Sequence, residues 1–114
     1  MSVERRNYLF REALLFLQES ARPLTRRQIY AGLASRVELT EAEKRISRKD
    51  RNLALYEMNC GYDLSNVGKR LGWVLHDPAE RTSALTAAGV EALQWPAEKM
   101  YAAMNEARKN GRAV

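Results

Sequence analysis

The chain has 114 residues, a net charge of +5 and 46% apolar residues, which suits one domain with a modest core rather than two. No apolar run approaches the ~20 residues of a membrane span, and the opening residues lack the apolar stretch of a secretory signal, so we expect a cytoplasmic protein with no membrane partner. With Cys60 as the only cysteine and His76 as the only histidine, neither an internal disulfide nor a cysteine/histidine metal cluster can form, and we expect no cofactor.

Two helices are predicted at the start of the chain. Apolar side chains recur at helical spacing over residues 3–21, and Pro23 ends this helix, because the residue before a proline disfavours helical geometry. Thr25 and Gln28 have the spacing of a capping box, in which each side chain accepts a hydrogen bond from the other's backbone. The box predicts a second helix over 25–36.

A third predicted helix carries the most basic stretch of the chain. Thr40 and Glu43 form another capping box, which opens a helix over about 41–58, and a break follows at residues 59–61 (Asn-Cys-Gly). The basic residues of this helix are Lys44, Arg45, Arg48, Lys49 and Arg51. Because Asp50 is the only acid among them, we expect a cationic surface.

A short helix and a hairpin are predicted next. Asp63 caps a fourth helix over 64–71, and Gly72 can adopt the left-handed conformation that ends it. The period then changes, and two β-prone runs, 73–75 and 83–85, flank a polar turn that contains Asp-Pro. Helices that lead into a short basic helix and then a β-hairpin are the arrangement of a winged helix-turn-helix. The sequence therefore predicts a mainly α fold with a small β-hairpin.

The C-terminal region is predicted as two helices separated by Pro96. Thr86 caps the first, and the second spans residues 97–109. We expect residues 1–95 to form the winged-helix domain and residues 96–114 a C-terminal helix and tail. Met100 and Met104 lie on one stripe of the last helix, which can pack on the domain or across a two-fold axis, so a homodimer through 97–109 is a further expectation.

Two segments resemble known families. The tail over residues 69–93 has a basic helix ending in glycine, an apolar strand, an arginine in the turn and then Leu-Thr-x-x-Gly-x-x-x-Leu, and it resembles the end of MarR and PadR regulators. The front half resembles the N-terminal winged-helix domain of Mrr-type restriction proteins, in residues 24–29 (Leu-Thr-Arg-Arg-Gln-Ile) and 39–44 (Leu-Thr-Glu-Ala-Glu-Lys). The resemblance covers roughly residues 8–93 and implies a DNA-binding winged helix. At 55–68 the chain lacks the tryptophan-containing helix of the Mrr pattern, and no nuclease domain is present.

A winged helix places one helix in the major groove, where the base edges are distinguishable. On the predicted helix 64–71, the residues facing away from the apolar stripe are Ser65, Asn66, Lys69 and Arg70, which we expect to read bases. Arg81 and Thr82, near the hairpin tip, are expected to contact phosphate or the minor groove, with His76 nearby, although Arg81 could equally pair with Glu80 or Asp77. A solvated helix face without a partner is the alternative to base reading.

Further cations are expected to neutralise phosphates: Arg48, Lys49, Arg51, Arg26 and Arg27. The sequence therefore predicts a sequence-specific double-stranded DNA-binding protein, a transcriptional regulator or a restriction- or phage-associated accessory factor, with no effector indicated. A winged-helix adaptor that binds only protein is the alternative. An RNA-binding role is disfavoured because the aromatic residues follow the apolar stripes, and the absence of a catalytic constellation argues against an enzyme.

Overall fold

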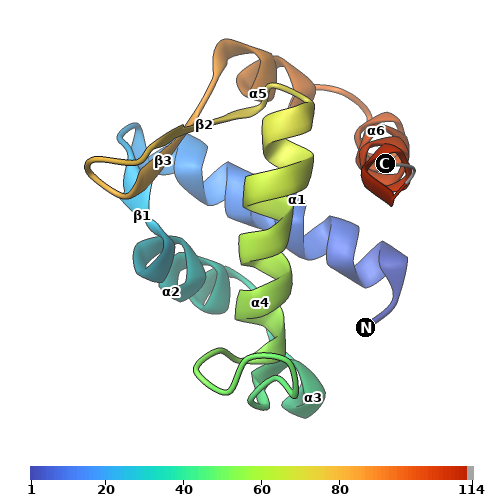
Figure 1. The fold of residues 1–114 in the computed structure, drawn as a ribbon. Helices are drawn as coiled ribbons and strands as arrows, with labels where there is room; N and C mark the ends of the chain where they lie inside the picture. Colours follow the sequence, from blue (N-terminus) through green and yellow to red (C-terminus); the bar gives the residue numbers. More distant parts are fainter. Residues whose placement is uncertain (113–114) are drawn as a thin grey trace.

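The computed structural model of the chain describes residues 1–112, which form a mainly helical fold with a three-stranded antiparallel sheet (Figure 1). The elements in chain order are α1 (Val3–Ser20), β1 (Leu24–Thr25), α2 (Arg26–Arg36), α3 (Glu41–Lys44), α4 (Leu55–Tyr62), η1 (Asp63–Gly68), β2 (Val74–Asp77), β3 (Thr82–Leu85), α5 (Ala87–Ala92) and α6 (Ala97–Arg112). Within this span, no helix has the length and apolar character needed to cross a membrane.

The first two helices and the hairpin are confirmed. At the start of α2, the Thr25 hydroxyl accepts a hydrogen bond from the Gln28 N–H at 3.2 Å, and the Gln28 side chain accepts one from the Thr25 N–H at 2.9 Å. The sequence did not reveal β1, whose residues pair with β3 (Leu24 with Ser83, Thr25 with Thr82). The sheet order is β1-β3-β2, so the start of α2 is attached to the hairpin. A strand of two residues is too short to show alternation.

The third predicted helix, 41–58, is wrong in its middle: residues 41–44 and 55–58 are helical, but they belong to two separate helices, α3 and α4. The Thr40 capping box forms, but α3 ends at Lys44, and residues 45–54 are a loop closed by an antiparallel bridge between Ile46 and Ala54. Within the loop, the Ser47 hydroxyl accepts from the Lys49 N–H at 3.1 Å, which offers the backbone an alternative to helical hydrogen bonds. The basic residues Arg48, Lys49 and Arg51 therefore lie on a loop and not on a helix.

The predicted break at 59–61 and the predicted cap at Asp63 are also wrong. α4 continues directly into the π-helix η1, so that residues 55–70 form one helix. Gly61 lies inside this helix, and a larger residue would be crowded there, because a Cβ would come within 2.5 Å of the Tyr30 hydroxyl of α2. Asp63 is an interior residue with 1% of its surface exposed. Gly72 ends the helix with φ of 71°, as predicted.

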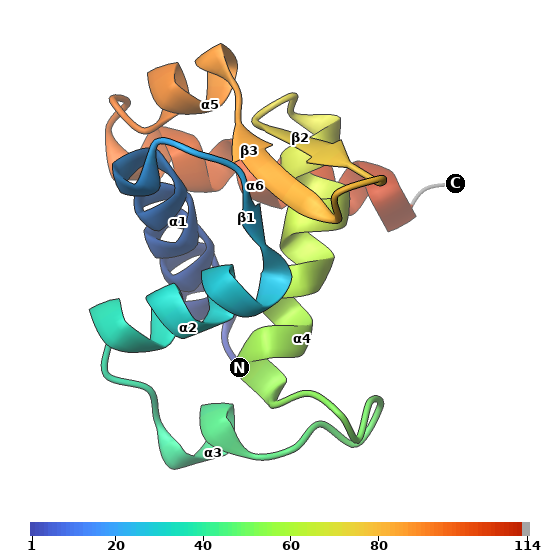
Figure 2. The same ribbon diagram turned by 90° about the vertical axis from the view of Figure 1, so that its left-hand side faces the viewer.

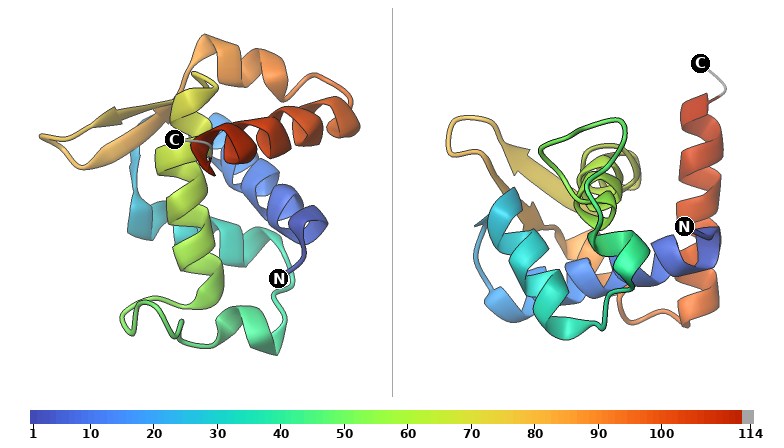
Figure 3. Two further views of the ribbon diagram at one scale, coloured as in Figure 1. Left: turned by 45° about the vertical axis from the view of Figure 1, so that its right-hand side comes forward. Right: turned by 90° about the horizontal axis from the view of Figure 1, so that it is seen from below.

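The core lies between α1, α2, the helix 55–70 and α6. Among its fully buried members are Phe10, Leu14, Ile29, Leu33, Leu64, Val67, Met100 and Met104. α6 lies across α1 and against η1 (Figure 3). The methionine stripe of α6 is thus buried within its own chain. Of the two alternatives that the sequence left open, the stripe packs on the domain and not across a two-fold axis. A homodimer through 97–109 stays a prediction, but Met100 and Met104 are not available to form its interface. Residues 113–114, at the end of the predicted tail, lie outside the described residues.

Candidate nucleic-acid interface

A groove of about 750 Å³ lies between the start of α2, the helix 55–70 and the β2–β3 hairpin. Six of the eleven residues predicted to bind DNA line it: Arg26, Arg27, Ser65, Lys69, Arg81 and Thr82. Pairing of β1 with β3 brings the two arginines of α2 beside the hairpin. The helix 55–70 ends just before β2, so Lys69 faces the same space from the other wall (Figure 2). Three elements far apart in the sequence therefore meet around one groove.

The groove is cationic. Arg26, Arg27, Lys69 and Arg81 line it, and no ion pair of the described residues involves any of these four. Arg26 instead donates a hydrogen bond to the Ser65 hydroxyl across the groove. The one carboxylate in the lining, Asp77, accepts from the backbone N–H groups of the turn at 3.0 and 3.2 Å. The turn role predicted for Asp77 is confirmed, and the four cations of the lining outnumber this one carboxylate.

Arg81 has an unusual backbone. Its φ of 57° lies in the left-handed region, which costs a residue with a side chain about 1–2 kcal/mol relative to right-handed geometry and which glycine adopts freely. The side chain is exposed and lines the groove. Arg81 does not form the alternative ion pair with Glu80 or Asp77. The chain therefore has an arginine at a position that favours glycine, and the side chain of this arginine adds a cation to the groove.

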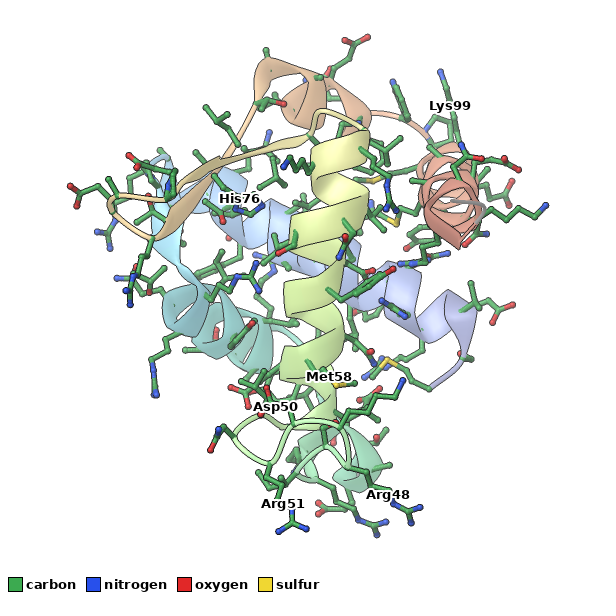
Figure 4. The ribbon with its side chains drawn as sticks, in the orientation of Figure 1. Arg48, Asp50, Arg51, Met58, His76 and Lys99 are labelled. Carbon is green, nitrogen blue, oxygen red and sulfur yellow. The ribbon has the colours of Figure 1, made fainter. Side chains whose placement is uncertain are left out.

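His76 holds the hairpin against the helix 55–70. Its Nε2 lies 3.1 Å from the Leu64 carbonyl oxygen and its Nδ1 lies 2.7 Å from the Ser83 hydroxyl (Figure 4). Because a carbonyl only accepts, Nε2 carries the proton and donates it. His76 is therefore not a residue of the hairpin tip, as the sequence suggested, but a link that fixes the two walls of the groove. The sequence also missed Thr25 and Ser83 in the lining, because strand pairing places them there.

Two predicted base-reading residues lie off the groove. The Asn66 side-chain amide donates to the Tyr62 carbonyl at 3.0 Å, one turn earlier in the same helix. The Arg70 guanidinium donates to the Ala107 carbonyl at 3.2 Å, which turns it towards α6. Both side chains remain partly or largely exposed, but the structure does not bring them together with Lys69.

The loop cations lie elsewhere. Arg48 and Arg51 are at the opposite end of the helix 55–70 from the hairpin (Figure 4), and Lys49 lies between them in the sequence, on the same loop. The loop and the hairpin project to the same side of the molecule (Figures 2 and 3). Arg48 and Lys49 border a different, apolar pocket. The eleven predicted residues thus divide into a groove set, a loop set, and the pair Asn66 and Arg70.

Among the described residues, no three histidine, cysteine or acidic side chains gather closely enough to hold a metal ion. No protein-family model, no curated protein and no solved structure matches the chain. The groove and its charges are therefore the basis on which a function can be argued.

Proposed function

We propose that the protein is a winged helix-turn-helix domain that binds double-stranded DNA in a sequence-specific manner. In this proposal the helix 55–70 enters the major groove, and the β2–β3 hairpin is the wing, which contacts the backbone or the minor groove. The order helix, strand, three helices, hairpin supports it, as does the pairing of β1 with β3 beside the wing. The resemblance to Mrr-type and MarR/PadR domains favours a transcriptional regulator or a restriction- or phage-associated factor.

The observation that carries the proposal is the meeting of four unpaired cations in one groove. Arg26 and Arg27 approach from α2, Lys69 from the long helix and Arg81 from the hairpin. Each cation that neutralises a phosphate releases condensed counterions, which drives binding at low salt. Ser65 also offers a hydrogen-bond donor to base edges. The two strands of duplex DNA provide phosphates on both sides of each DNA groove. This arrangement fits a protein whose cations come from separate elements.

Titration of a fluorescently labelled duplex of random sequence tests this function. At four phosphate contacts, raising the salt from about 50 to about 200 mM is expected to weaken binding roughly 100-fold. The same titration with an unlabelled single strand as competitor tests the preference for a duplex. Absence of duplex binding at low salt would contradict the proposal and favour the protein-binding adaptor.

A further inference from the structure

A second pocket, of about 360 Å³, lies beside the start of α4. Its lining is mostly apolar and includes Ala42, Ile46, Leu55 and Met58. Ile46 is 59% exposed, although the side chain is fully aliphatic. We call this site the loop pocket, because the loop 45–54 forms one of its walls.

The loop pocket is built by hydrogen bonds. The Ser47 N–H donates to the Leu53 carbonyl at 2.7 Å, and the Leu55 N–H donates to the Arg45 carbonyl at 2.9 Å. Between them, Ile46 pairs with Ala54 as an antiparallel bridge. The loop backbone is thus fixed on both sides of Ile46, and this fixed backbone presents the aliphatic side chain to solvent.

The pocket is bordered by positive charge. Arg45, Arg48 and Lys49 are among its lining residues, and none of them takes part in an ion pair within residues 1–112. The nearby Asp50 carboxylate accepts from the Asn52 backbone N–H at 2.9 Å. An occupant therefore needs an apolar group for the floor and negative charge for the rim.

We propose that the loop pocket docks an acidic segment of a partner protein, in which one large apolar side chain is flanked by carboxylates. The apolar side chain packs on Ile46, Leu55 and Met58, and the carboxylates pair with the three cations of the rim. Duplex DNA is complementary to the charge of the rim but not to the apolar floor, because its phosphates would pair with the three cations and leave the floor exposed to water. The loop pocket is separate from the cationic groove that we propose binds DNA. The protein would therefore hold DNA at one end of the helix 55–70 and a partner protein at the other.

Selection from a displayed library of random 12-residue peptides tests the proposal, because it identifies the preferred ligand chemistry directly. Peptides enriched on the wild-type protein are expected to share a large apolar residue flanked by aspartate or glutamate. Their affinity is expected to fall at least ~10-fold in Ile46→Ser, as for a residue at the centre of an interface. Leu75→Ser is the matched control, since Leu75 is 68% exposed on β2, and it should bind as the wild type does.

Amide chemical shifts of the labelled protein then locate each ligand. The selected peptide should perturb residues 42–58, and duplex DNA should perturb the groove residues around Arg26 and Thr82. Three results would overturn the proposal: no enriched motif, enrichment that survives Ile46→Ser, or duplex DNA that shifts the loop amides as strongly as the groove amides. Thermal unfolding of both serine variants near the wild-type temperature confirms that they are folded.

Discussion

The guanidinium of Arg108 in α6 donates to both carboxylate oxygens of Asp63, with distances of 3.3 Å from Nε to Oδ1 and 3.1 Å from Nη2 to Oδ2. Arg6 of α1 donates to the same two oxygens at 3.0 and 2.9 Å. Asp63 opens η1, so one buried carboxylate joins the first and last helices to the helix that carries Lys69. This ion triad fixes the rotation of the long helix relative to the core.

Replacing the shared carboxylate is expected to destabilise the fold strongly. Asp63→Asn keeps the shape but leaves two arginines without their counter-charge, one of them buried, which costs about 3–5 kcal/mol in comparable sites. The free energy of unfolding from urea titration measures the loss. Glu106→Gln, on an exposed position of α6, is the control and should change stability by less than about 0.5 kcal/mol. A loss below about 1 kcal/mol in Asp63→Asn would contradict the structural role.

Stability should fall in acid because of Glu43. The hydrogen bonds from Arg5, at 2.9 and 3.0 Å, lower the pKa of the Glu43 carboxyl below its ordinary value of 4.5. A lowered folded-state pKa means that the pair stabilises the protein above that ordinary value, and that this contribution is lost as the pH falls through the lowered pKa. Urea titrations between neutral pH and about pH 3 should show a decline that is smaller in Glu43→Gln by roughly 1 kcal/mol, as for a partly exposed pair. Identical pH profiles for the two proteins would disprove the assignment.

The thiol of Cys60 should be inert in the folded protein. Burial, with a smaller contribution from the nearby Asp63 charge, raises the pKa of Cys60 to about 12. The thiolate, which is the reactive form, is then scarce at pH 8, and we expect reaction with a disulfide reagent to be about 1000-fold slower than for an exposed cysteine. Cys60→Ala combined with Ala34→Cys provides that exposed cysteine on α2. Comparable labelling rates would contradict the burial.

Local side-chain chemistry made several boundaries predictable. The caps at Thr25, Thr40 and Thr86 and the left-handed stop at Gly72 all form, because each depends on residues three or four positions away. The continuous helix 55–70 was not predictable in this way. Residues 59–61 read as a break because the sequence does not show that Tyr30 packs against Gly61.

Distant partners also explain the errors in the candidate site. Asp63 read as a cap, since its two arginines lie 57 and 45 residues away along the chain. Lys69 and Arg70 are neighbours with the same charge, and only the position of α6 separates them. The residue types that line the groove were thus predictable from the sequence. Which of the predicted residues share the groove, and which lie on other surfaces, depends on tertiary packing.

Lys69 and Arg70 should differ in their effect on DNA binding. Lys69→Ala removes a groove cation, so it is expected to weaken binding to all duplex sequences and to reduce the slope of log affinity against log salt by about 1. Arg70→Ala removes a cation that is directed to the Ala107 carbonyl, and the slope should stay at the wild-type value. Fluorescence anisotropy at four or more salt concentrations measures both slopes. Equal reductions would show that both cations contact DNA.

The salt dependence of duplex binding in two double variants tests the groove most directly. For Lys69→Ala with Arg81→Ala, the slope should fall by about 2, because two phosphate contacts are lost. Arg48→Ala with Arg51→Ala removes the same charge from the loop, and its slope should match the wild type. A groove variant that binds as the wild type does, or a loop variant that loses as much, would contradict the assignment of the groove to DNA.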